Sequence, residues 1–160
     1  MKLIFAKSVL FSLILLVGSS SFANFTGVWV GEGTVTTRDG REISCNQFVL
    51  NVTHGADKME FGRFSYGCDE FAFNFTPPVL TLGEKKIVSQ DTFWKEEKVG
   101  KISSTRADLL FPLANNGKAR YTVRKTSDNE MNYLDEQIGI NAETGKEEIT
   151  AIRAKLKRVE

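Results

Sequence analysis

The stretch that decides the fold is Thr26-Gly-Val-Trp-Val-Gly-Glu-Gly-Thr-Val35, which sets one tryptophan among three glycines in a segment that otherwise has strand composition. Trp29, Gly31 and Gly33 share one face, because successive side chains of a strand point to opposite sides. Glycine inside a strand is typical of a bend or a close backbone approach. We therefore expect Trp29 to point inward and the strand to bend beyond it, leaving room beside the ring.

The residues before this stretch have the pattern of a secretory signal peptide. Two lysines mark a basic start, an apolar run extends from Val9 to Val17, and small residues lead to Ala23. The run is too short to span a bilayer, which takes about 20 apolar residues. We expect residues 1–23 to be cleaved and residues 24–160 to form one secreted or periplasmic domain with no integral membrane segment.

The charge balance argues against nucleic acid as a partner. The chain carries 21 Lys and Arg against 20 Asp and Glu, and removal of the two leader lysines leaves one more acid than base. A nucleic-acid-binding face needs a basic excess to neutralise phosphates. Short charged runs, such as KEEK at 95–98, are typical of solvated faces.

Turn signals divide the rest of the chain into short segments rich in Val, Ile, Phe, Tyr and Thr, the composition of β-strands. Strict alternation in Phe71–Phe75 and Ala119–Val123 indicates strands with one dry face and one wet face. We count about eight to ten strands, joined mostly by hairpins. Strands at this spacing form a sandwich or a barrel.

The C-terminal segment 147–159 fits two structures. Its large apolar residues recur at helical spacing, but Ile152, Ala154 and Leu156 also alternate as in a strand. The Ala, Lys and Glu content favours a helix, whereas the turn signal at 143–145 favours a hairpin. We expect the last strand here, because a barrel needs a final strand to cover its first edge.

Cys45 and Cys68 are the two cysteines of the chain. In an oxidising compartment a disulfide is the first expectation. A redox site would favour a C-x-x-C spacing, and a zinc site needs about four ligands. If the two cysteines face each other across a hairpin, its centre falls within the turn signal at 54–57, which is identified independently.

The same hairpin register makes a further prediction. It sets Val49 opposite Phe64 and Gln47 opposite Tyr66, which are suitable cross-strand pairs. A bulge at one of the two glycines of the second strand, Gly62 or Gly67, would shift this register by one residue.

The sequence lacks a motif that carries catalysis. His54 is the single histidine, and no Ser or Cys in a nucleophile-elbow context accompanies it. Adjacent acids such as Asp69 and Glu70 point to opposite faces of a strand, so they do not form the carboxylate pair of a glycosidase. Phosphate-binding and dinucleotide-binding loops are also missing. We expect no enzyme, no metal site and no cofactor.

Gly27-Val28-Trp29, at the start of the first strand, resembles the G-x-W signature of the lipocalins and their calycin relatives, the fatty-acid-binding proteins and avidins. The resemblance implies an all-β, antiparallel up-and-down barrel of about eight to ten strands. In that superfamily the Trp closes the narrow end, and an Arg from the end of the last strand packs across it. Arg158 is the candidate partner here, with Arg153 as second choice. Gly27, Trp29 and Arg158 are thus the expected barrel closure.

The longer pattern, Gly27-x-Trp29-x-Gly31-x-Gly33, is also similar to the start of the nitrobindin-like haem barrels. Those barrels need a haem-ligating His late in the chain. No His follows His54, so haem is not expected.

Aromatic residues are the remaining signal. In a small barrel they either fill the core or line a lumen that holds one apolar molecule. Alternation and size select these candidate wall residues: Trp29, Phe73, Phe75, Trp94, Phe111, Tyr121 and Tyr133.

Two functions therefore stay open. The first is a secreted or periplasmic, non-catalytic barrel that binds a small apolar ligand or lipid. The second is a protein-binding barrel that acts through an exposed loop or face, such as an inhibitor of a secreted enzyme or a surface interaction module. The volume of the lumen separates them.

Overall fold

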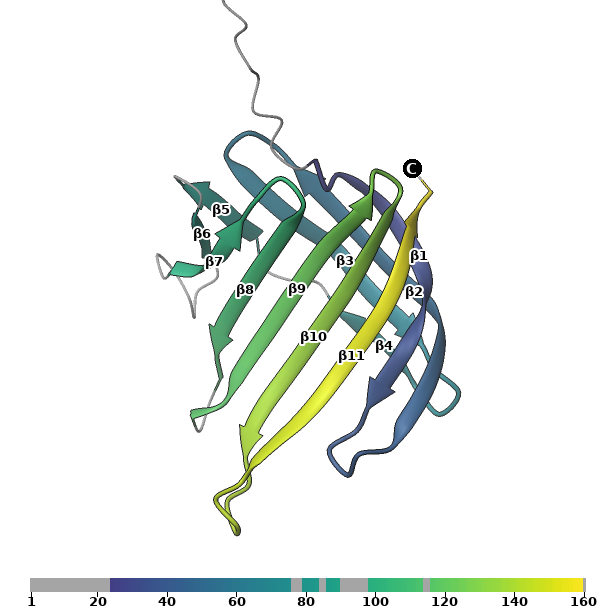
Figure 1. The fold of residues 1–160 in the computed structure, drawn as a ribbon, viewed down its shortest axis with the longest axis vertical. Helices are drawn as coiled ribbons and strands as arrows, with labels where there is room; N and C mark the ends of the chain where they lie inside the picture. The colour runs from purple at the N-terminus through teal and green to yellow at the C-terminus, as the bar shows by residue number, and fades with distance from the viewer. Residues whose placement is uncertain (1–23, 76–78, 84–85, 90–97, 114–115, 160) are drawn as a thin grey trace, which may run out of the picture.

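The protein forms one antiparallel sheet that curls on itself (Figure 1). The structure, a computed structural model, describes residues 24–75, 79–83, 86–89, 98–113 and 116–159. Its strands are β1 (Gly27–Thr36), β2 (Glu42–His54), β3 (Lys58–Gly67), β4 (Ala72–Phe75), β5 (Val79–Gly83), β6 (Lys86–Ser89), β7 (Lys98–Ile102), β8 (Arg106–Pro112), β9 (Lys118–Ser127), β10 (Glu130–Ile140) and β11 (Glu147–Arg158). The described residues include no α-helix, so none that could cross a membrane.

The topology is that of an up-and-down barrel. Consecutive strands are neighbours from β5 to β11, β11 returns to pair with β1, and β2 pairs with both β1 and β3. Both β4 and β5 pair with β3, and they keep one register, because Phe75 lies opposite Phe64 and Leu80 lies opposite Met59. They occupy one strand position beside β3, so the described residues form a barrel with ten strand positions. The predicted all-β barrel of about eight to ten strands is confirmed.

The C-terminal segment is a strand, as predicted. β11 pairs with β10 from Glu147 to Lys157 and with β1 from Ala151 to Arg158. It therefore covers the edge that β1 would otherwise expose, and the helical alternative is excluded.

Trp29 closes one end of the barrel. Its side chain is fully buried, and its indole Nε1 donates a hydrogen bond of 2.9 Å to the carbonyl oxygen of Phe25, which is itself fully buried. Arg158 lies directly opposite Trp29 in the β1–β11 ladder, with its guanidinium carbon 6.0 Å from the ring centroid. Gly27 has φ 147°, a conformation that residues with a side chain rarely adopt. This is the arrangement expected for the G-x-W stretch and its arginine.

The glycines after Trp29 have a different role from the one expected. A Cβ atom at Gly31 would overlap the carbonyl oxygen of Lys155, and one at Gly33 would overlap that of Arg153. The space on this face is filled by the backbone of β11, so the prediction of open room beside the Trp29 ring is wrong. The glycines let β11 approach β1 closely enough to close the barrel.

The hairpin of β2 and β3 carries the predicted disulfide between Cys45 and Cys68. Near its turn the register is the predicted one, with His54 opposite Met59. The register then shifts by one residue, because Val52 on β2 lies opposite Phe61 whereas the preceding Asn51 lies opposite Arg63. The predicted pairs beyond the bulge are wrong: Phe64 lies opposite Leu50, Ser65 lies opposite Val49, and Gln47 has no ladder partner opposite it on β3. The bulge adds one residue to the β3 side, as Gly62 allows.

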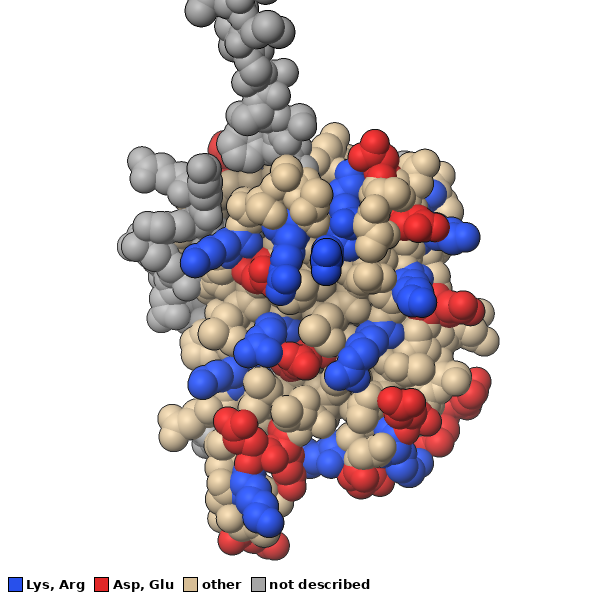
Figure 2. All heavy atoms as spheres, viewed as in Figure 1, with Lys and Arg blue, Asp and Glu red and all other residues tan. Residues whose placement is uncertain are grey.

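On the face seen in Figure 2, basic side chains predominate over the centre, and acidic side chains lie mostly toward the right and lower edges. Several pairs connect neighbouring strands or turns, such as Arg120 with Glu136 at 3.0 Å and Arg38 with Glu148 at 3.1 Å. Exposed pairs of this kind stabilise a fold by about 1 kcal/mol or less.

Replacing Trp29 by Ala should lower the free energy of unfolding by about 3 to 5 kcal/mol, because it removes a fully buried ring from the closed end. Trp29→Phe keeps much of the bulk and loses the hydrogen bond to Phe25, so it should cost less. Urea denaturation of the two variants checks this, and a near-neutral Trp29→Ala would contradict the closing role of the ring.

Gly31→Ala should also destabilise the barrel, by about 1 to 3 kcal/mol or more, because the new methyl group meets the β11 backbone rather than a flexible side chain. Gly139→Ala on β10 is the matched control, since a Cβ atom there meets nothing within 4 Å. Thermal melts should show the first variant weakened and the second unchanged or slightly stabilised. Equal effects would mean that close approach of β11 is not what requires glycine.

Candidate ligand cavity

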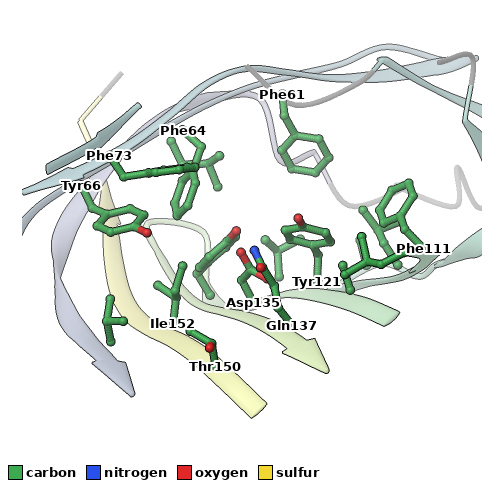
Figure 3. Close-up of a pocket in the computed structure, with 18 of the residues that line it drawn as sticks. Phe61, Phe64, Tyr66, Phe73, Phe111, Tyr121, Asp135, Gln137, Thr150 and Ile152 are labelled. Atoms are coloured by element: carbon green, nitrogen blue, oxygen red, sulfur yellow. The ribbon is translucent and has the colours of Figure 1, made fainter. Parts of the chain in front are cut away.

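The barrel is packed at the Trp29 end and hollow toward the other. A cavity of about 560 Å³ lies inside it, within the size range of small-molecule sites (Figure 3). Fully buried side chains that do not line the cavity, including Phe25, Trp29, Met131 and Leu156, fill the closed end. The cavity wall is mostly apolar, and its aromatic members are Phe61, Phe64, Tyr66, Phe71, Phe73, Phe111, Tyr121 and Tyr133.

Four of the predicted wall residues, Phe73, Phe111, Tyr121 and Tyr133, line this cavity. Trp29 does not, because its ring is part of the closed end. The other two predictions remain open: Trp94 and the side chain of Phe75 lie outside what the structure describes.

The sequence analysis missed four aromatic wall residues. Phe61 and Phe64 both point inward although they are three positions apart, because the bulge in this hairpin breaks the alternation of β3. Tyr66 follows Phe64 at strand spacing, and Phe71 precedes Phe73 in the same way. The sequence shows the alternation in both segments. It does not show the strand register, which determines which face of each strand points into the barrel.

The aromatic wall residues contact one another. The rings of Phe64 and Tyr133 have centroids 4.7 Å apart, which joins β3 to β10 across the lumen. Tyr66 stacks on Phe73 at 5.2 Å, and the ring of Tyr121 meets that of Phe111 edge-on at 5.6 Å. Such contacts are worth about 0.5 to 1.5 kcal/mol each beyond their buried area, so the wall is held in place before any ligand enters.

One part of the cavity rim is aromatic and lies next to the disulfide. Phe71 and Phe73 line the cavity yet remain 38% and 44% exposed, so they lie where the cavity meets solvent. The backbone N–H of Cys68 donates to the carbonyl oxygen of Phe71 at 2.8 Å, and the disulfide ties Cys68 to Cys45 on β2. The bond therefore fixes the turn that carries Phe71 into the rim.

Asp135 is the polar exception in the wall. It sits on β10 two residues after Tyr133 and therefore on the same inward face, opposite Tyr121 on β9 and Ile152 on β11. Its residue surface is only 4% exposed, and its Oδ1 atom has no hydrogen-bond partner in the described part of the chain. Burial, with a smaller contribution from the charge of Glu136, raises the pKa of Asp135 to about 7. Alternation from Tyr133 could have identified this residue.

Three tyrosines of the wall respond to the same environment. Burial, and then the negative charge of Asp135, raise the pKa of Tyr66 to about 12 and raise the pKa values of Tyr121 and Tyr133 as well. All three hydroxyl groups are therefore neutral at ordinary pH. Gln137 and Thr150, which face each other across β10 and β11, add neutral polar groups to the wall.

Among the described residues, no three His, Cys, Asp or Glu side chains lie close enough together to hold a metal ion.

Comparison with known proteins supports the fold. No protein-family model matches the chain, and no curated protein matches it. Among solved structures, the S-type phycobiliprotein lyase CPES from Guillardia theta has a TM-score of 0.59 at 10% identity, over 86% of this chain and 89% of the lyase. A protein with unknown function from the DUF3598 family of Nostoc punctiforme has a TM-score of 0.55 at 12% identity, over 85% of this chain. The chain spans about half the length of that protein, since the match covers 48% of it. At these identities the likeness is one of fold, and the barrel is calycin-like in its curled antiparallel sheet.

Asp135→Asn should stabilise the protein at pH 8 and have little effect at pH 4. Because the folded-state pKa of Asp135 is raised from 3.8 to about 7, the folded chain holds its proton more tightly than the unfolded chain does. Stability from this group is present below about pH 4 and is lost as the pH rises to 7. A shift of about three pKa units corresponds to at most about 4 kcal/mol.

Urea denaturation at pH 4, 6 and 8 checks this, with Asp128→Asn as control because the carboxyl of Asp128 is 96% exposed. A gain for Asp135→Asn that is equal at all three pH values would contradict the buried, ionising carboxyl.

Proposed function

We propose that this chain is a non-catalytic binding protein that holds one small, largely apolar ligand inside its barrel. The single observation that carries the proposal is the cavity of about 560 Å³ with an aromatic and aliphatic wall. A barrel of this size can be filled by its own side chains. Here the described side chains fill the Trp29 end and leave the cavity beyond it, and an apolar cavity with few polar groups is typical of a ligand site.

The proposed site of action is outside the cytoplasm, in the periplasm or the extracellular space. The disulfide supports this, because such bonds persist in oxidising compartments. The signal-peptide pattern of residues 1–23 supports it independently. We further propose that the G-x-W closure reflects a lipocalin-like origin, supported by the contact between Trp29 and Arg158.

The structure favours ligand binding over the alternative of a protein-binding module. A protein-binding barrel gains nothing from an apolar interior space, and emptying a core costs stability. The exposed phenylalanines, Phe71 and Phe73, also line the cavity rim, so their exposure is explained by ligand entry.

A cavity-filling substitution tests the proposal. Ala119 lines the cavity on β9, so Ala119→Phe should place a ring in the space that the ligand needs. Leu110→Phe is the matched control, because Leu110 on β8 is 46% exposed and does not line the cavity. We expect wild type and control to bind the neutral fluorescent probe N-phenyl-1-naphthylamine equally, and Ala119→Phe to bind it at least roughly ten-fold more weakly.

Thermal melts must show that Ala119→Phe is folded. If it binds the probe as well as wild type does, or if wild type binds no probe, the proposed site is wrong.

A further inference from the structure

The cavity holds one acid that no described residue balances. Among the described residues that line the cavity, two are charged, Asp135 and Arg38. The side chain of Arg38 is 69% exposed and pairs with Glu148, so it belongs to the rim. Asp135 is almost completely buried, and its Oδ1 atom has no hydrogen-bond partner among the described residues. Figure 3 shows Asp135 and Gln137 on the wall that faces Phe61 and Phe64 across the cavity.

A buried, unbalanced carboxyl is costly for a protein that has no use for it. An ionised group out of water needs a partner, and a buried acceptor without a hydrogen-bond donor destabilises the fold even when the group is neutral. Leu, Val or Ala at this position would fill the wall without that cost. The residue therefore indicates that the missing partner enters with the ligand.

Resting on the function proposed above, we propose that the ligand is an apolar amine, whose protonated nitrogen binds Asp135 while its hydrocarbon or aromatic body fills the cavity. The ammonium group supplies the donor that Oδ1 lacks among the described residues, and it brings a positive charge to the carboxyl in the interior, whereas the charge of Arg38 lies at the rim. Tyr66, Tyr121 and Tyr133 place aromatic rings around the same region, and ring faces attract cations. An anionic ligand such as a fatty acid is disfavoured, because its carboxylate would meet Asp135.

The affinity for an amine should rise with pH as Asp135 ionises. The titratable groups that face Asp135, Tyr121 on the neighbouring strand β9 and Tyr66 on β3 across the lumen, stay neutral, as does Tyr133 on its own strand. On β11 the residue opposite Asp135 is the apolar Ile152. Glu136 points outward and pairs with Arg120. Asp135 is therefore the group whose ionisation near pH 7 controls the binding of an amine, which itself stays protonated to about pH 10.

Three ligands with the same chain test the proposal: n-dodecylamine, 1-dodecanol and dodecanoate, each measured by displacement of N-phenyl-1-naphthylamine below its aggregation limit. At pH 8 the amine should bind at least ten-fold more tightly than the alcohol, and dodecanoate more weakly than either. Between pH 8 and pH 6 the affinity for the amine should fall about ten-fold, following ionisation of Asp135, while that for the alcohol stays constant.

Asp135→Asn should remove both the preference for the amine and its pH dependence, so that the variant binds the amine and the alcohol with affinities within about three-fold of each other. Asp128→Asn, at an exposed carboxyl outside the cavity, should keep both. Equal affinity of wild type for amine and alcohol, or an amine preference that survives Asp135→Asn, overturns this inference and leaves the binding function standing. If neither the probe nor the alcohol binds, the binding function fails first. If Asp135→Asn does not fold, the affinities of wild type for the amine and the alcohol still test the inference.

Discussion

The close approach of β11 to β1 is the contact on which the barrel depends. Gly31 and Gly33 permit it, because a Cβ atom at either position would overlap the backbone of β11. Both strands would otherwise leave an edge with unpaired N–H and C=O groups, which folded proteins avoid. Once they pair, Arg158 is brought opposite Trp29, and the ring is trapped between the last strand and the segment that contains Phe25. The short stretch from Trp29 to Gly33 thus allows the first and last strands to pair and also closes one end of the barrel.

Closure at one end leaves the interior unevenly filled, and the proposed function rests on the cavity that remains. The wall residues beyond the closed end are large enough to contact one another but not to fill the space, so a cavity remains between β3 on one side and β9 and β10 on the other. The disulfide acts at the opposite end, where it holds the turn before β4 and with it the aromatic part of the rim. Asp135 places a buried carboxyl in a mostly apolar wall, and in our proposal this group determines which ligands bind.

Much of the architecture could be predicted from the sequence, because alternation, turn signals and the G-x-W stretch are local. They predicted an all-β barrel, the last strand at 147–159, and a pairing of Cys45 with Cys68. Sequence could not reveal which face of β3 is inside beyond the bulge, since a single extra residue reverses every later side chain. That is why Phe64, which lies beyond the bulge, was missed. The purpose of Gly31 was misread for a related reason: its neighbour is the backbone of a strand more than a hundred residues later.

The candidate site was predictable in kind but not in detail. Size and alternation identified Phe111 and Tyr121 as wall residues, whereas Asp135 was not predicted to line the cavity because most acids are exposed. Burial depends on the whole barrel, and only the assembled sheet shows that this carboxyl points into an apolar space.

Native mass spectrometry of the purified full chain tests the central claim, that the interior is a ligand site, most directly. We predict one non-covalent adduct of small-molecule mass per chain, either carried through purification or formed when n-dodecylamine is added, and its absence from Ala119→Phe. A chain that stays free of any adduct after dodecylamine and dodecanol have both been offered would contradict the account.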